Sequence, residues 1–214
     1  MQTDTKSTER TLTPAPSLAE LEADCWQQLA TALAQKQNRT ESHGFQTMTV
    51  ATCTHLGADA RTVVLRQVDT DRKYVWFHTD ARAEKVIQLE AFPNAVLLLW
   101  DPAQQIQLRL TIEPRLHTDD HVADDHWQKL WVGGRKQYLS AHTPGSVQPA
   151  PYPGFPPELG ENLPSPEESE AGRTNFAVIE CRVLAVDYLR LSRAGQTRAR
   201  FEYEPNERFS WLAP

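Results

Sequence analysis

Cysteines and long apolar runs are scarce in this 214-residue chain, and each absence excludes a class of protein. The three cysteines, Cys25, Cys53 and Cys181, are scattered without a CxxC spacing, which argues against a disulfide framework and against a zinc ribbon. The longest apolar run, residues 95–100, has six residues, whereas a membrane-spanning helix needs about 20. The amino terminus lacks the apolar segment of a secretory signal. We therefore expect a cytoplasmic protein with no membrane partner.

Two further absences concern ligands. The formal net charge of −6 provides no basic footprint for a nucleic-acid backbone, so we expect no nucleic-acid partner. A small phosphorylated ligand needs only two or three clustered cations, and net charge does not exclude it. The two commonest nucleotide-binding motifs, GxGxxG and GxxxxGK followed by Ser or Thr, do not occur.

The amino-terminal part of the chain predicts a flexible arm and then a helix. Residues 1–16 are polar and predict the arm, and residues 17–214 suit a single domain. Ser17 can cap the helix, with Glu20 as the returning partner of a capping box. Apolar residues then recur at spacings of three and four, which predicts a helix packed on a sheet or barrel: Leu18, Leu21, Cys25, Leu29 and Leu33.

The rest of the chain is predicted to be mainly β. Strands are indicated over 45–54, 61–68, 74–78, 95–100, 105–116, 176–191, 197–203 and 209–212. Helices are indicated over 81–92 and 117–131, and residues 143–166, with eight of the 15 prolines, predict a long irregular loop. Because strands and helices do not alternate regularly, this order favours an antiparallel barrel with peripheral helices.

The densest anion-binding chemistry lies between Arg61 and Lys85. Arg61 and Arg66 lie five residues apart, so on a strand their side chains point to opposite faces. Lys85 and Arg82, near the start of the predicted helix, can reach the same edge. A guanidinium binds phosphate through two parallel hydrogen bonds, and a lysine adds a point charge. On spacing alone, these cations fit either a phosphate site or an ordinary solvated surface.

The order of several motifs is more specific. RTVVLR at 61–66, WFHT at 76–79, IQLRL at 106–110, RARFEY at 198–203 and a terminal WLAP together resemble a divergent subgroup of the pyridoxamine 5'-phosphate oxidase family. The resemblance implies an FMN-binding split β-barrel and a homodimer with FMN at its two-fold interface. It also implies an oxidoreductase that passes hydride from a small-molecule substrate to FMN, which oxygen reoxidises. Two alternatives stay open: a non-catalytic FMN-binding or sensor module, and an F420- or heme-binding relative on the same fold.

The resemblance also implies which residues contact FMN. The strand 61–66 would run along the flavin and its phosphate, His78 and Thr79 match an FMN-contacting pair, and Lys85 matches a phosphate-binding lysine. The full expected set is Arg61, Thr62, Val63, Val64, Leu65, Arg66, His78, Thr79, Arg82, Lys85, Gln107, His142, Thr143 and Arg200.

The departures from the family pattern concern one phosphate cation and the substrate side. Ala83 and Glu84 replace a serine and an arginine, so Arg82 is the candidate for the missing cation and Glu84 is expected to point away. The family's substrate-gripping Arg-x-His reads Gln196 and Arg198 here. The residues that hold the substrate phosphate have no match within 119–139.

Candidates for substrate contact are His142, Arg198 and Arg135. We expect no catalytic acid–base residue, because such an oxidase needs little proton-transfer machinery beyond the flavin. We also expect no metal site. His117 and His121 lie four apart among carboxylates, but a helix capped by Thr118, with acidic residues at its positive end, accounts for that pattern.

Overall fold

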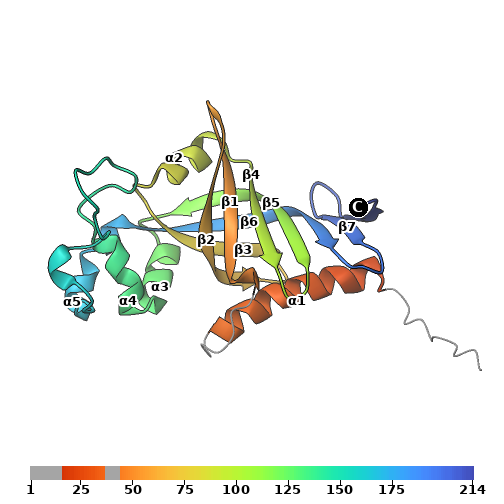
Figure 1. The fold of residues 1–214 in the computed structure, drawn as a ribbon, viewed down its shortest axis with the longest axis horizontal. Coiled ribbons are helices and arrows are strands. Elements are labelled where there is room, and N and C mark those ends of the chain that lie inside the picture. Colours follow the sequence, from red (N-terminus) through yellow and green to blue (C-terminus); the bar gives the residue numbers. More distant parts are fainter. Residues whose placement is uncertain (1–15, 37–43) are drawn as a thin grey trace, which may run out of the picture.

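Within residues 16–36 and 44–214, which this computed structural model describes, six antiparallel strands close into a barrel and two more strands extend it (Figure 1). The strand order is β3–β2–β1–β4–β5–β6, β6 also pairs with β3, and β7 and β8 continue outward from β6. The fold class expected from the sequence is therefore confirmed. The strands are β1 (Thr47–Thr54), β2 (Gly57–Asp69), β3 (Tyr74–Asp80), β4 (Ala95–Asp101), β5 (Ile106–His117), β6 (Phe176–Arg190), β7 (Thr197–Glu202) and β8 (Arg208–Leu212).

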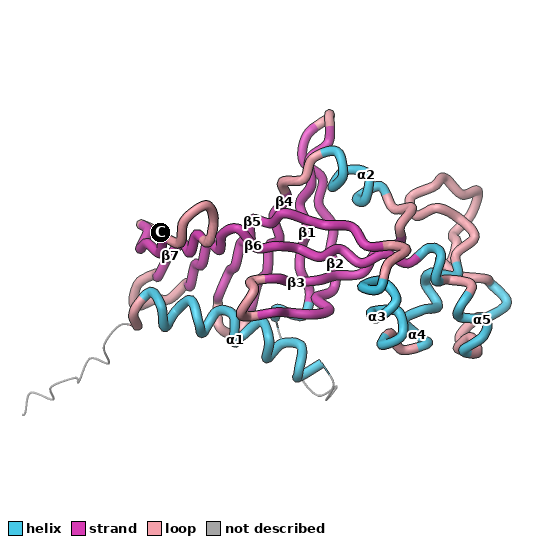
Figure 2. The backbone as a smooth tube through the Cα atoms, turned by 180° about the vertical axis from the view of Figure 1, so that it is seen from behind, coloured by secondary structure: helices cyan, strands magenta, loops and turns pink. Residues whose placement is uncertain are grey.

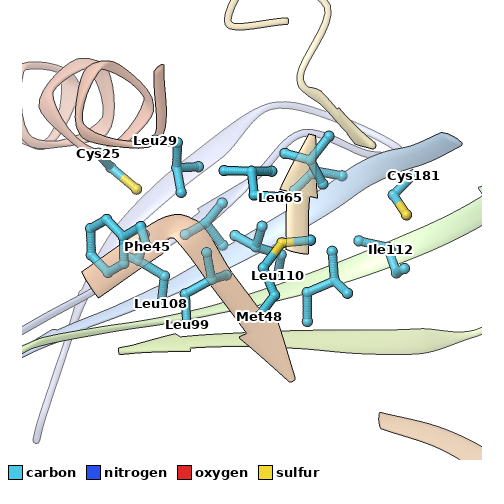
Figure 3. Close-up of a cluster of buried hydrophobic side chains, with 14 of the residues drawn as sticks. Cys25, Leu29, Phe45, Met48, Leu65, Leu99, Leu108, Leu110, Ile112 and Cys181 are labelled. Atoms are coloured by element: carbon cyan, nitrogen blue, oxygen red, sulfur yellow. The ribbon is translucent and has the colours of Figure 1, made fainter. Parts of the chain in front are cut away.

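The barrel interior is filled by alternate residues of each strand. On β5, for example, Leu108, Leu110 and Ile112 are fully buried, and the residues between them face outward. Figure 3 shows these side chains packed against Leu65 of β2 and Met48 of β1. The period of two therefore decides, for each strand, which side chains are available to a ligand outside the barrel.

Helix α1 (Leu18–Lys36) begins with the predicted capping box. The Glu20 backbone N–H donates to Ser17 Oγ at 3.2 Å, and the Ser17 N–H donates to Glu20 Oε2 at 2.8 Å. The predicted apolar stripe is confirmed, because Cys25 and Leu29 are buried in the core (Figure 3). The predicted arm at residues 1–16 lies outside the described residues except for Pro16.

A hydrogen-bonded chain ties α1 to the carboxyl-terminal strands. Trp26 Nε1 donates to the Tyr203 hydroxyl at 2.7 Å, and that hydroxyl donates to Glu22 Oε1 at 2.8 Å. Lys73 Nζ forms an ion pair with the same Glu22 carboxylate at 2.8 Å. These polar groups satisfy one another where α1 crosses the barrel.

The remaining α-helices lie outside the barrel: α2 (Glu84–Ala91), α3 (His121–Lys129), α4 (Val132–Arg135) and α5 (Pro166–Glu170). Figures 1 and 2 show α3, α4 and α5 together at the end of the molecule opposite to β7. The described residues also form four short 3-10 helices: η1 (Gly44–Gln46), η2 (Lys136–Leu139), η3 (Pro157–Leu159) and η4 (Arg173–Asn175). Residues 140–165, all of them described, contain no α-helix or strand. No helix among the described residues is long and apolar enough to cross a membrane.

Two predicted helix starts were wrong. Helix α3 is capped by Asp120 and not by Thr118, because the Asp120 carboxylate accepts from the backbone N–H groups of Val122 and Ala123 at 3.1 and 3.0 Å. Helix α2 begins at Glu84 and not near residue 81. The residues before it form a turn in which the Arg82 N–H donates to Asp80 Oδ1 at 2.8 Å.

Candidate functional site

Three of the predicted FMN contacts, Arg61, Thr79 and Lys85, meet where the ends of β2 and β3 approach α2; we call them the β2–α2 cluster. Lys85 Nζ donates to Thr79 Oγ1 at 3.0 Å. Arg61 reaches the same helix, where its Nη2 donates to Gln88 Oε1 at 2.9 Å. Two cations and a hydroxyl from three separate elements therefore share one small region, as the sequence motifs predicted.

Electrostatics in the β2–α2 cluster favour an anion. Burial lowers the pKa of Lys85, and the positive charge of Arg61 lowers it further. The Arg61 side chain is about one-fifth exposed, at 22%. Two partly buried cations held close together repel each other and have lost part of their hydration. An incoming phosphate would relieve both penalties.

Arg61 already has partners within the chain. Its Nη1 donates to Thr52 Oγ1 at 2.6 Å, and its Nη2 forms a short ion pair with the carboxylate of Asp59. Gln88 Nε2 donates to the same carboxylate at 3.2 Å. The guanidinium is therefore held in place by β1, β2 and α2 together.

Arg82, the candidate for the missing phosphate cation, faces a different neighbour. Its Nε and Nη2 donate to the two carboxylate oxygens of Asp80 at 2.9 and 2.7 Å, and Nη2 also donates to the Ser140 carbonyl at 3.0 Å. This bidentate pair neutralises the charge of Arg82 locally. Glu84 is exposed at the start of α2.

The other predicted residues of β2 divide between the two faces of the strand. Val63 and Leu65 are buried in the barrel, so only their backbone groups can face a ligand outside it. Thr62 is exposed and Val64 is half-buried on the outer face. Arg61 and Arg66 point to opposite faces, as their spacing predicted.

Arg66 lies in a β-bulge. The pairing of β2 with β3 shifts between Leu65, which pairs with Phe77, and Gln67, which pairs with Trp76, so Arg66 is the extra residue. A bulge redirects a side chain, and bulges are common beside functional sites. The buried Arg66 Nε has no hydrogen-bond partner among the described residues. Burial also lowers the pKa of this guanidinium, which leaves a desolvated cation suited to an anionic ligand.

A cavity of about 500 Å³, here called the outer pocket, lies between this face of the barrel and α3 and α4. Arg66 and His78 line its barrel side, and His126, Lys129 and Trp131 line its helix side. The Trp131 indole is 62% exposed. Lys129 is paired with Asp125 at 2.6 Å, so the outer pocket combines the Arg66 cation with an exposed aromatic surface, which suits a small anionic ligand with a ring.

The two histidines of the outer pocket are joined. His78 Nε2 and His126 Nδ1 lie 2.9 Å apart, with their rings nearly perpendicular at 81°. Burial is the main cause that lowers the pKa of His126. One hydrogen bond joins the two rings, and the tautomers decide which nitrogen donates.

His142 and Thr143 lie in the loop that follows Ser140. They line a second cavity of about 400 Å³, in which the His142 ring meets the Tyr152 ring edge to face at 4.7 Å. The Arg82–Ser140 hydrogen bond connects this loop to the end of β3. The loop that carries the predicted His142 and Thr143 is thus held by Arg82 and not by a residue of the β2–α2 cluster.

Gln107, Arg198 and Arg200 lie on β5 and β7, away from the other predicted residues. Gln107 pairs with Leu189 of β6, which in turn pairs with Arg198. Arg198 Nη2 forms an ion pair with the buried carboxylate of Asp187 at 2.9 Å, and Arg200 Nε pairs with Glu202 at 3.1 Å. Figure 1 shows β7 and helices α3–α5 at opposite ends of the molecule, so one chain alone does not bring Arg198 to the outer pocket.

Arg135, predicted to contact substrate, is used inside the protein. Its guanidinium donates to the carbonyl of Trp127 at 2.9 Å, to Ser169 Oγ at 3.3 Å and to Glu170 Oε1 at 2.5 Å. It also lies over the Trp127 ring, 4.7 Å from the centroid. These contacts hold α5 against α3, and we leave Arg135 out of the proposed substrate site.

Sequence reasoning missed four residues of this region. Gln88 and Asp59 had a usable signal, since Gln88 lies three residues after Lys85 on one helix and Asp59 lies two residues before Arg61 on one strand. His126 and Lys129 had none, because the packing of α3 against the barrel brings them to Arg66. His117, in the segment weighed as a metal site, bonds through Nδ1 to Asp120 at 2.6 Å. The described residues contain no group of three or more side chains that could hold a metal ion.

Comparison with known proteins agrees with this geometry. Residues 23–117 match the family model for the pyridoxamine 5'-phosphate oxidase, FMN-binding domain. This stretch holds the β2–α2 cluster, Arg66 and His78, and it ends before the loop with His142 and before β7. Comparison with curated proteins gives no significant match.

Solved structures share the fold. A pyridoxamine 5'-phosphate oxidase-related, FMN-binding protein from Nostoc punctiforme aligns over 87% of this chain and 95% of its own, with a TM-score of 0.63 and 22% identity. PhzG from Burkholderia lata, solved with tetrahydrophenazine-1-carboxylic acid, aligns over 95% and 98%, with a TM-score of 0.68 and 15% identity. The resemblance read from the motifs is confirmed over residues 23–117, which carry the sequence signature of the pyridoxamine 5'-phosphate oxidase FMN-binding domain, and the chain shares the split-barrel fold of these solved proteins.

Proposed function

We propose that the protein is a flavoprotein that binds FMN and acts as an oxidoreductase on a small anionic molecule. The observation that carries the proposal is the β2–α2 cluster, in which Arg61, Thr79 and Lys85 present two cations and a hydroxyl to one point. These are donors that a phosphate monoester requires, and they lie within the segment that matches the FMN-binding domain.

Different residues would bind the two parts of FMN. The β2–α2 cluster would hold the phosphate, and the exposed outer side of β2, with Thr62 and Val64, would lie along the flavin. FMN, when bound, supplies the acceptor for a hydride and passes the electrons on to oxygen. The protein's own part is to bind, orient and exclude water, so we propose no catalytic acid or base.

The outer pocket supports an anionic substrate. Arg66 supplies positive charge from the barrel side, and the exposed Trp131 offers a flat surface for a ring on the helix side. Lys129, also on the helix side, is paired with Asp125 at 2.6 Å. The PhzG structure was solved with a ring carboxylic acid, which is a ligand of this chemical kind. The substrate itself is left to experiment.

A homodimer completes the proposed site. Gln107, Arg198 and Arg200 are predicted to face the flavin or the substrate, yet they lie on β5 and β7. Figure 1 shows β7 at the opposite end of the molecule from α3 and α4, which line the outer pocket. The exposed Leu98 and Trp100 side chains, at 37% and 38%, lie on β4 next to Gln107 and offer apolar area for a dimer contact. In a two-fold dimer, the Gln107, Arg198 and Arg200 of one chain would lie beside the outer pocket of the other.

One observation favours a second function, an FMN-binding or sensor module without turnover. Arg198 replaces a substrate-contacting residue of the family, and its guanidinium is already paired with the buried Asp187. A residue held in this way is less available to grip a substrate. The experiment must therefore distinguish FMN binding without turnover from FMN binding with turnover.

The test begins with purified protein incubated with FMN and freed of excess cofactor. We expect the visible absorption of bound flavin, quenched flavin fluorescence and one FMN per chain. A protein that takes up no FMN refutes both functions, and uptake of F420 in its place supports the relative on the same fold. Anaerobic mixing with NADPH, pyridoxamine phosphate or ring carboxylates then separates the two: bleaching of the flavin shows an oxidoreductase, and persistent colour with every donor supports the module.

A further inference from the structure

Asp59 sits at the entrance to the proposed phosphate site, in ion-pair contact with Arg61. Its carboxylate also accepts a hydrogen bond from Gln88 Nε2 at 3.2 Å, and its side chain is 43% exposed. The Gln88 hydrogen bond is the main cause that lowers the pKa of Asp59, and Arg61 and Lys85 add to it. The group is therefore an anion at neutral pH.

This anion takes a position that a phosphate would need. Arg61 uses Nη1 on Thr52 and Nη2 on both Gln88 and Asp59. A guanidinium binds a phosphate best when two of its N–H groups point at two phosphate oxygens. The carboxylate and the phosphate therefore compete for the outward side of the Arg61 guanidinium.

Charge counting leads to the same conclusion. Arg61 and Lys85 contribute two positive charges to the β2–α2 cluster, and Asp59 cancels one of them. Arg82 adds no net charge, because Asp80 pairs with it. A dianionic phosphate thus meets a site with one net positive charge, and Asp59 repels it.

We propose that Asp59 is an internal competitor that sets how tightly the cofactor phosphate is held. The proposal rests on the proposed FMN-binding function and adds a residue that tunes it. In the free protein Asp59 neutralises Arg61, and on binding the phosphate displaces it. The outcome is a cofactor site that is weaker, and less selective for a phosphorylated flavin, than its two cations would make it.

Substitution Asp59→Asn tests this directly, because asparagine keeps the shape and can still accept from Arg61. Binding of FMN and of riboflavin, which lacks the phosphate, is measured by quenching of flavin fluorescence. We expect the variant to bind FMN about tenfold more tightly, the size of effect expected for one unit charge a few ångströms from a phosphate when water screens the exposed carboxylate. Riboflavin should bind equally well to both proteins. FMN affinity should also fall more steeply with salt in the variant.

Glu113→Gln is the matched control. It removes one negative charge from an exposed ion pair with Arg182, 2.7 Å long, on the far strands β5 and β6. It should leave both flavins unaffected, which shows that overall charge is not the cause. Circular dichroism confirms that each variant is folded.

Each result decides one question. Unchanged or weaker FMN binding by Asp59→Asn overturns the role of Asp59, as does equal tightening of FMN and riboflavin. If the unaltered protein binds neither flavin, the proposed function fails and the Asp59 proposal fails with it. If the unaltered protein binds FMN and the variant does not bind it better, only the Asp59 proposal fails.

Discussion

The substitution Lys85→Met should separate cofactor binding from folding. Methionine has a similar length but no charge, so the variant loses the Nζ that now donates to Thr79 at 3.0 Å. A charge-assisted hydrogen bond contributes about 1.5–3 kcal/mol. We therefore expect FMN to bind about 10- to 150-fold more weakly. Riboflavin, which has no phosphate, should bind the variant as well as it binds the unaltered protein.

The same change has a calculable effect on thermal stability. At an FMN concentration 100 times the Kd of the unaltered protein, the bound cofactor adds about 2.7 kcal/mol of stability. A variant with a 30-fold weaker Kd keeps about 0.9 kcal/mol under the same conditions. The difference of about 1.8 kcal/mol corresponds to about 4–7 °C less FMN-induced increase in Tm.

Without FMN, Lys85→Met should not lower the thermal stability. Burial and the neighbouring Arg61 charge lower the pKa of Lys85, so holding this cation opposes folding. The apo form of Lys85→Met should therefore melt at the same temperature as the unaltered protein or higher. Thermal melts followed by circular dichroism, with and without FMN, measure both effects.

A charge-matched control and a clear refutation are available. Lys136→Met removes the same charge from a half-buried lysine outside the cluster, which donates to the carbonyls of Gly160 and Asn162. It should keep the full FMN-induced increase in Tm. An unchanged Kd for FMN in Lys85→Met would refute the assignment of the β2–α2 cluster, and equal weakening of riboflavin would show that the phosphate is not its target.

Three further results are expected. The free energy of unfolding should fall as the pH drops below about 6.5, the ordinary pKa of histidine. Burial lowers the pKa of His126 in the folded state, so the unfolded chain binds more protons below that pH. His126→Phe should flatten this pH dependence in denaturant titrations, and an unchanged slope would contradict it. A mixed dimer, with Lys85→Met in one chain and Arg200→Ala in the other, should bind one FMN tightly. If each site takes Lys85 from one chain and Arg200 from the other, both changes fall in one site and the second site is unaltered. Loss of all tight binding would place both residues in a single-chain site. Tyr203→Phe should lower the free energy of unfolding by about 1–3 kcal/mol, because the Trp26 N–H and the Glu22 carboxylate both lose the Tyr203 hydroxyl as their partner. A change near zero in urea denaturation would show that water replaces the hydroxyl.

Local patterns predicted most of the fold. The capping box at Ser17, the apolar stripe of α1 and most of the strand ranges, such as 105–116, were all readable, because each depends on near neighbours in sequence. The cap of α3 was not, since Thr118 and Asp120 can both cap a helix and only the turn after β5 selects between them. The bulge at Arg66 was also invisible, because it depends on pairing with β3.

The candidate site was predictable for a different reason. Spacing alone left the cations of 61–85 undecided. The family motifs singled out Arg61 and Lys85, and the structure brings these two together with Thr79, while Arg66 and Arg82 lie elsewhere. The walls of the outer pocket were unpredictable, because Lys129 reaches Arg66 only through packing of an outer helix on the barrel. Arg135 was misleading, since a cation in the sequence gives no sign that Glu170 will neutralise it.

One strand serves two ligand groups because of its geometry. Along β2, the alternation of side chains points Arg61 toward Gln88 at the end of the barrel interior and places Arg66, at the bulge, in the outer pocket beside His78. The strand between them exposes only Thr62 and Val64, small side chains that a flat ring can approach closely. A phosphate held at one end would therefore leave the ring along the strand and its far edge facing the outer pocket. Because Thr62, Val64 and Arg66 alternate with the buried Val63 and Leu65, one face of a single strand carries both the surface for the ring and the cation of the outer pocket. This alternation is what joins the two halves of the proposed site.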